Sequence, residues 1–166
     1  MNQGIAHAKW GTAVLSANPE EFAEEVYSFF GIGTNLQELY ISHDLMTDEM
    51  WDILAEGAKW SRANSHILVD SHWIGGDPVK LEVYGCASWQ DDQGVIMLRN
   101  PDDKPREIGI DIAEAFHLPY GAAKSYFLKS PWKADASKQA ITLMSGKKHT
   151  FKLQPFEVIV LEGKGL

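Results

Sequence analysis

The chain has 166 residues, of which 45% are hydrophobic and 23% charged, and its formal net charge is −8. This composition can fill a hydrophobic core and excludes wholesale disorder. The acidic charge is spread along the chain without a basic stripe, which argues against a nucleic-acid partner. No apolar run approaches the roughly 18 residues that a membrane span needs. The single cysteine, Cys86, excludes an internal disulfide.

The first part of the chain predicts helices joined by short strands. Residues 10–17 could form a short buried strand. Asn18, Pro19 and Glu21 are typical of a helix start, because they supply a cap, a first-turn proline and a capping box. The apolar stripe of this helix has a period near 3.6 and ends at two glycines. It comprises Phe22, Val26, Phe29 and Phe30, followed by Gly31 and Gly33.

Residues 36–42 favour a strand over a short helical turn, and Thr47 is positioned to cap a second helix. The buried face of this helix is predicted to comprise Trp51, Leu54, Ala55 and Ala58. The apolar run Ile67-Leu68-Val69 is short enough for a buried strand that delivers Asp70 to a rim. Gly75 and Gly76 then permit a sharp change of direction.

From Lys80 onward the hydrophobic period changes to two, which indicates β-strands. One strand face comprises Leu81, Val83, Gly85, Ala87 and Trp89, and the other Glu82, Tyr84, Cys86 and Ser88. Further strands are expected at 95–98, 107–112, 126–128, 140–144, 149–153 and 156–161, a spacing typical of an antiparallel sandwich. The predicted fold class is therefore α+β, with a partial β/α segment over residues 1–76 and an antiparallel all-β sandwich over residues 77–166.

Several stretches resemble one known architecture. They are Gly33-Thr-Asn-Leu-Gln-Glu-Leu-Tyr40, the Asp70–Pro78 bend, Tyr84-Gly-Cys-Ala-Ser-Trp89, Leu98-Arg-Asn-Pro101 and Pro155-Phe-Glu-Val-Ile-Val-Leu-Glu162. Together they resemble the C-terminal region of glycoside hydrolases of the α-galactosidase type, which carry a (β/α)₈ barrel followed by an antiparallel β-sandwich. The resemblance implies that residues 1–76 are the last barrel units, with Asp70 at the mouth of the final strand. It also implies that the nucleophile and the acid/base belong to earlier strands that this chain lacks.

Two carboxylates are weak catalytic candidates. Glycoside hydrolysis needs two carboxyl groups roughly 5 to 10 Å apart. Glu38 lies within a predicted strand and Asp70 follows one, so the two could face one cleft. The competing interpretation is that Glu38 is a solvated residue and that Asp70 caps a backbone turn.

An aromatic group near the bend is a candidate sugar-binding surface. His72, Trp73, Tyr84 and Trp89 could present flat rings to a pyranose, and Asp77 is included as a polar contact. The competing interpretation is that these rings pack between the two parts of the chain. Asp70, His72 and Asp77 lack a fourth ligand at metal-binding spacing, so no metal is predicted. No cofactor is predicted either, since phosphate-loop and dinucleotide fingerprints are absent from the sequence.

These patterns leave three functions open. The first is a C-terminal fragment of a glycoside hydrolase, inactive alone, whose sandwich scaffolds the end of a catalytic barrel. The second is a stand-alone carbohydrate-binding or protein-interaction module, and the third is a folded remnant without a ligand. The expected partners are a carbohydrate, and either the remainder of a barrel or a second copy bound through residues 1–76, because unpaired strand edges tend to associate. Exposure of Trp73, Trp89 and Trp132 should distinguish binding from scaffolding.

Overall fold

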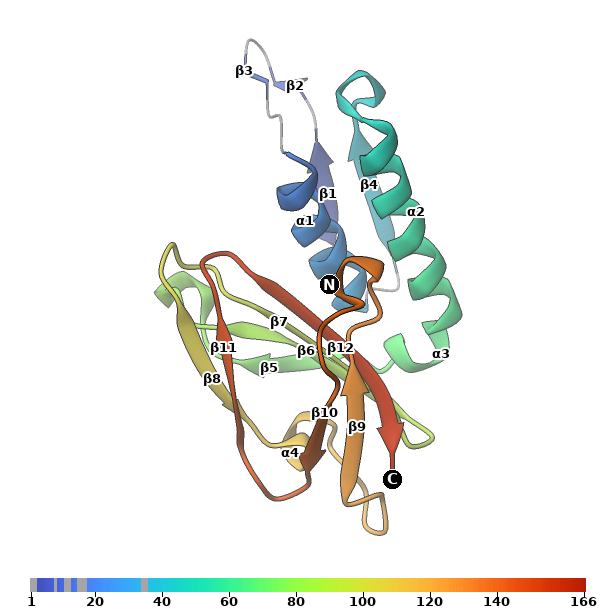
Figure 1. Ribbon diagram of the computed structural model, residues 1–166, viewed down its shortest axis with the longest axis vertical. Helices are drawn as coiled ribbons and strands as arrows, with labels where there is room; N and C mark the ends of the chain where they lie inside the picture. The colour runs from blue at the N-terminus through green and yellow to red at the C-terminus, as the bar shows by residue number, and fades with distance from the viewer. Residues whose placement is uncertain (1–2, 8, 11–12, 15–17, 34–35) are drawn as a thin grey trace.

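The computed structural model describes residues 3–7, 9–10, 13–14, 18–33 and 36–166. Helices cover one face of a six-stranded sheet, and a separate two-stranded sheet lies against the other face (Figure 1). The predicted α+β class with an antiparallel sandwich is therefore confirmed. In the described part of the chain, each helix is too short or too polar to span a lipid bilayer.

The N-terminal segment forms a β/α arrangement. Its elements are β1 (Gln3–His7), β2 (Lys9–Trp10), β3 (Ala13–Val14), α1 (Pro19–Gly31), β4 (Gln37–Ile41), the 3₁₀ turn η1 (His43–Leu45), α2 (Asp48–Ala63) and α3 (Ser65–Leu68). Strands β1 and β4 pair in parallel, and α1 is the crossover between them, which makes a βαβ unit. Strand β1 is not among the elements expected from the sequence. The strand expected over residues 10–17 falls partly outside the described residues, and β2 and β3 form a short antiparallel pair there.

Both predicted helix starts are confirmed. The side-chain oxygen of Asn18 accepts a hydrogen bond from the Glu21 N–H at 2.7 Å, and the Thr47 hydroxyl accepts one from the Met50 N–H at 3.2 Å. These bonds satisfy backbone donors that a helix leaves unpaired in its first turn. The predicted apolar stripe of α1 is fully buried, and Gly33 follows its end with a φ of +72°.

The predicted buried face of α2 was right for Leu54 and Ala58, which belong to or pack against the helix-side core, and wrong for Trp51 and Ala55. Trp51 is 43% exposed and Ala55 is exposed. The residues of α2 that are buried are Met50, Leu54, Gly57, Trp60 and Ser61. The helix is rotated in this way because Gly57 is the point of close approach to α1: a Cβ there would lie 2.7 Å from side-chain atoms of Val26 and Phe30.

The strand predicted at Ile67-Leu68-Val69 was also wrong. Residues 65–68 form the short helix α3, in which the Asn64 carbonyl accepts hydrogen bonds from the Ile67 and Leu68 N–H groups. Ile67 and Leu68 are buried whereas Val69 is 59% exposed, so Ile67 and Leu68 form the buried face of α3. A three-residue apolar run carries too little periodicity to separate these two structures.

The C-terminal segment is an antiparallel β-sandwich. Its elements are β5 (His72–Gly75), η2 (Pro78–Lys80), β6 (Tyr84–Gln90), β7 (Gln93–Arg99), β8 (Arg106–Ile110), α4 (Ile112–Ala115), β9 (Ser125–Lys129), η3 (Lys133–Asp135), β10 (Ile141–Met144), β11 (His149–Leu153) and β12 (Val158–Gly165). The larger sheet has the strand order β10-β9-β12-β7-β6-β5, and β8 pairs with β11 in the smaller one. Lys80 and Leu81 fall in a turn and not in the expected strand.

Two hydrophobic cores lie on opposite faces of the six-stranded sheet. The helix-side core joins side chains of α1, α2 and α3 to Cys86, Met97 and Val160 of the sheet. The inner core lies between the other face and β8, β11 and α4. Strand β5 pairs with β6 throughout, although it precedes the bend at residue 76. The sheet therefore serves both as one layer of the sandwich and as the surface on which the helices pack.

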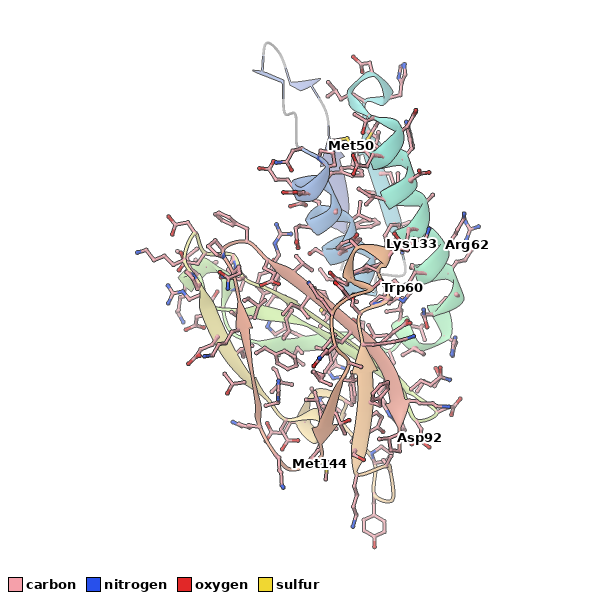
Figure 2. All side chains as sticks on the ribbon, viewed as in Figure 1. Met50, Trp60, Arg62, Asp92, Lys133 and Met144 are labelled. Atoms are coloured by element: carbon pink, nitrogen blue, oxygen red, sulfur yellow. The ribbon has the colours of Figure 1, made fainter. Side chains whose placement is uncertain are left out.

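A loop from the sandwich also reaches the helices. Residues 130–138, here called the crossing loop, follow β9 and pass over α1 and α2 (Figure 1). Trp132 of this loop stacks on Tyr27 of α1 with centroids 4.3 Å apart, and meets Trp60 of α2 edge-on at 4.9 Å. The adjacent Lys133 N–H donates to the Glu56 carboxylate at 3.0 Å. Figure 2 labels Lys133 on this loop and Trp60 on α2.

The contact between α1 and β12 contains a half-buried carboxylate. The Val158 N–H donates to Glu24 at 2.6 Å. Burial raises the pKa of Glu24 to about 7; the Val158 bond opposes this rise, the Glu157 carboxylate adds to it, and the cations Lys138 and Arg99 oppose it. Because the folded-state pKa lies above the ordinary value of 4.5, the stability linked to this group is complete below that value. It is lost as the pH rises through about 7.

We therefore expect Glu24→Gln to make the protein more stable than the native chain at about pH 8, and to flatten the pH dependence of stability. The amide oxygen can still accept the Val158 N–H bond without carrying a charge. Denaturant unfolding at about pH 5 and about pH 8 measures both effects. Glu21→Gln, an exposed change on the same helix, should leave the slope unaltered; an equal slope in the native chain and Glu24→Gln would contradict the assignment.

Candidate functional site

Glu38 lies on the face of β4 that points away from α1 and α2, here called the bare face. The neighbouring Gln37 side chain donates to Ser61 of α2 at 3.2 Å, and Leu39 lines a cavity of about 380 Å³ together with residues of α1 and α2. Side chains alternate along a strand, so Glu38 and Tyr40 point away from the helices. The Tyr40 hydroxyl donates to the Glu38 carboxylate at 3.2 Å, and both residues are exposed.

Asp70 does not lie at the mouth of a strand, which corrects the expectation drawn from the resemblance. It is exposed in the turn after α3, next to Ser71, whose hydroxyl donates to the Ile32 carbonyl. Ile32 precedes β4, so this turn lies at the amino end of that strand. Barrel active sites lie at the carboxyl ends of the strands. Asp70 is therefore at the opposite end from any such site, and the structure does not place it and Glu38 in one cleft.

The carboxyl end of β4 carries polar residues that the sequence reasoning passed over. The strand leads directly into η1, which exposes His43 and Asp44. In a β/α architecture this is the position from which catalytic and binding side chains project. The available signal was a polar pair immediately after the strand predicted over residues 36–42. These two residues are the better candidates for any chemistry at this end of the segment.

His72 and Asp77 have local structural contacts. The Nε2 atom of His72 lies 2.6 Å from the Ala115 carbonyl, and its ring stacks on His117 at 4.0 Å. Asp77 accepts the Val79 N–H bond at 3.0 Å, which caps η2, and pairs with Lys80 at 3.4 Å. Asp70, His72 and Asp77 do not form a cluster, and no group of three metal-ligating side chains occurs within the described residues.

The candidate sugar-binding aromatics are divided between the two faces of the sheet. Trp89 packs against the inner core, and its Nε1–H donates to the Tyr126 hydroxyl at 2.8 Å. Trp73 and Tyr84 lie on the other face, where their rings stack with centroids 5.0 Å apart and an interplanar angle of 5°. Of the three diagnostic tryptophans, Trp73 is 43% exposed, Trp89 partly buried and Trp132 only 3% exposed. Trp73 and Tyr84 thus come together, whereas Trp89 and Trp132 belong to packing.

Charged groups lie beside the stacked pair. Arg99 is the cross-strand partner of Tyr84, and its Nη2 donates to the Glu25 carboxylate of α1 at 2.8 Å. Burial raises the pKa of the Tyr84 hydroxyl, Arg99 opposes this rise and Glu25 adds to it. This ion pair joins β7 to α1.

No model of a known protein family matches the sequence, and no curated protein matches it. Solved structures share its fold. A protein from Bacillus halodurans assigned as an α-N-acetylgalactosaminidase aligns with a TM-score of 0.65 and 10% identity, over 93% of this chain and 34% of its own. The α-galactosidase of Saccharomyces cerevisiae aligns at 0.60 and 10% identity, over 90% and 44%. An α-amylase from Geobacillus thermoleovorans aligns at 0.59 and 11% identity, over 89% and 34%.

The chain thus spans from about a third to less than half of each of these structures. At such low identities the likeness establishes the fold alone. That fold, β/α units followed by a β-sandwich, is the one that the resemblance to α-galactosidase-type glycoside hydrolases implied.

Proposed function

We propose that the chain is the C-terminal portion of a glycoside hydrolase, in which the sandwich scaffolds the end of a catalytic barrel, and that it is inactive alone. The observation that carries the proposal is the parallel pair β1–β4. Its helices lie on one side only, while Glu38 and Tyr40 face away from them. A β/α sheet is ordinarily covered on both faces or closed into a barrel.

The exposed apolar side chains in and beside β4 support the proposal that a further strand belongs next to it. Leu36 is 51% exposed and Tyr40 is 58% exposed in or beside β4. Strand β4 pairs with β1, and in the described part of the chain no strand pairs with its other edge. An unpaired edge with apolar side chains is a site for another strand. The remainder of a barrel would supply that strand, parallel to β4, and would cover Glu38 and Tyr40.

The scaffolding role is supported by the helix-side core. The backbone of α1 approaches the sheet so closely at Gly31 that a Cβ there would lie 2.8 Å from the Met97 side chain. The sandwich therefore holds the helix that connects β1 to β4. In a complete enzyme this contact would fix the position of the last two barrel strands.

The direct test is hydrolysis of p-nitrophenyl α-D-galactopyranoside by the purified chain, alone and mixed with a separately expressed barrel half of an α-galactosidase. We expect no turnover by the chain alone and restored turnover in the mixture. Asp44→Asn, at the carboxyl end of β4, should lower the restored rate, whereas Asp70→Asn should not. Turnover by the chain alone that Glu38→Gln or Asp70→Asn abolishes would instead identify a small complete enzyme.

The bare face should also drive self-association when no barrel half is present. We expect the isolated chain to form dimers or larger species through residues 1–76, and Tyr40→Lys to weaken this association about tenfold or more, because a charge would be buried in the contact. Analytical ultracentrifugation measures the dissociation constant. Tyr120→Lys makes the same change at a fully exposed position of the sandwich and should have no effect; equal effects of the two variants would contradict this interface.

A further inference from the structure

The stacked pair Trp73 and Tyr84, here called the aromatic platform, has one open side. Tyr84 covers one face of the Trp73 indole in a parallel stack. The 43% exposure of Trp73 therefore belongs to the opposite face and the ring edge. Tyr84 is itself half-buried and lies in the sheet between β5 and β7, so the indole is held flat against a rigid support. A rigid, flat ring binds with little loss of conformational entropy.

Hydrogen-bonding groups lie at the border of this platform. Arg99 adjoins Tyr84 across the strand pair, and its side chain is 21% exposed, with one nitrogen used by Glu25. Glu25 is 50% exposed, so its carboxylate can accept further bonds. The N–H donors of the Arg99 guanidinium and the acceptor oxygens of the Glu25 carboxylate therefore lie beside the aromatic platform.

The free edge of the sheet adds backbone groups. β5 is the last strand of the six-stranded sheet. The Gly76 N–H donates to the Val83 carbonyl at 2.8 Å, which makes these two residues a hydrogen-bonded pair. Bonded and non-bonded pairs alternate in an antiparallel ladder, so the N–H and C=O of Trp73 point outward from the edge. They border a groove of about 190 Å³ between β5 and β8, which also contains Asp111 and His117.

We propose that the aromatic platform is a surface-binding site for one neutral pyranose ring, with Arg99, Glu25 and the outward backbone of Trp73 contacting its hydroxyls. A pyranose presents an apolar C–H face to an aromatic ring and hydroxyls around its rim, which is the combination that the platform and its border offer. This site is separate from the barrel end of the chain.

The surrounding charge argues for a neutral ligand. Helix α1 exposes Glu25 beside the platform and Glu20 and Glu21 about one turn earlier along the helix, and the whole chain carries a net charge of −8. An anionic ligand or a second copy of this acidic chain would meet repulsion there. A neutral sugar meets none.

The test uses the full chain, titrated separately with methyl α-D-galactopyranoside and methyl α-D-glucopyranoside, with the indole N–H signals followed by NMR. We expect saturable shifts of the Trp73 signal by at least one of them, with a dissociation constant on the order of 1 mM, as is typical for a ligand of this size. Trp73→Leu, which keeps an apolar side chain but removes the flat face, should weaken binding about tenfold or more. The backbone amide signals of β5 and β6, which lie at the platform, report binding in that variant.

Trp51→Leu is the matched control, because Trp51 on α2 is also 43% exposed and has no aromatic stacking partner among the described residues. It should leave the dissociation constant unchanged. Equal binding by the native chain and Trp73→Leu, or the absence of saturable shifts with both sugars, would overturn the proposal. So would a sedimentation change in Trp73→Leu without sugar binding in the native chain, since the platform would then be a contact between copies. Because the chain is tested without a barrel half, this outcome is independent of the assembly and hydrolysis experiments.

Discussion

Replacing Trp132 by alanine is expected to lower the free energy of unfolding by about 3–5 kcal/mol. Trp132 belongs to the crossing loop yet is only 3% exposed. Its ring stacks on Tyr27 at 4.3 Å and meets Trp60 at 4.9 Å, so truncation leaves a cavity where α1, α2 and the sheet meet. Denaturant unfolding followed by circular dichroism measures the loss.

Two further variants make this expectation specific. Trp51→Ala removes the same side chain from an exposed position and should change stability by less than about 0.5 kcal/mol. Trp132→Phe keeps a ring against Tyr27 and removes a buried indole N–H that has no hydrogen-bond partner, so it should cost clearly less than alanine. A loss below about 1 kcal/mol for Trp132→Ala would show that the crossing loop does not hold the helices to the sheet.

Asn100→Asp is expected to destabilise the sandwich by at least about 3 kcal/mol at neutral pH. Asn100 is completely buried. Its Nδ2 donates at 2.8 Å to the carbonyls of Lys104 and of Gln154, and its Oδ1 accepts the Asp102 N–H bond at 3.0 Å. A carboxylate in this position would face two carbonyl oxygens without a donor of its own.

The pH dependence of this variant identifies the cause. Burial beside carbonyl oxygens would raise the pKa of the introduced carboxyl, so its contribution to stability is complete at low pH and is lost as the pH rises. The deficit relative to the native chain should therefore shrink as the pH falls. Asn18→Asp makes the same chemical change at an exposed helix cap, where aspartate is also a good capping residue, and should be neutral or slightly stabilising. A deficit in Asn100→Asp that does not change with pH would contradict this explanation.

Much of the fold could be predicted from the sequence, because local signals and burial agree there. Asn18 and Thr47 cap their helices as the sequence indicates. The alternation from Val83 to Trp89 gives the two faces of β6 correctly, with Ala87 in the inner core and Cys86 in the helix-side core. The same alternation puts Tyr84 and Trp89 on opposite faces of the strand. The sequence therefore already indicated that His72, Trp73, Tyr84 and Trp89 could not all form one binding surface.

The errors arose where tertiary contacts decide the structure. The face of α2 is set by the close approach of Gly57 to α1, which no property of the α2 sequence reveals. The run Ile67-Leu68-Val69 is too short for its period to be read, and Asp70 was misplaced with it. His43 and Asp44 were overlooked because a turn after a strand becomes informative only once the strand is known to lie in a parallel pair.

The shared sheet has a consequence for how such a chain can be divided. The change from helices to strands along the sequence falls near Gly75 and Gly76, but β5, which precedes it, hydrogen-bonds to β6, which follows it. Cutting the chain at this point would remove β5 from the edge of the six-stranded sheet. It would also separate α1 from the sheet face on which it packs. We therefore expect the two halves to unfold as one cooperative unit, and we expect a sandwich moved into another protein to need the preceding helices to stay folded.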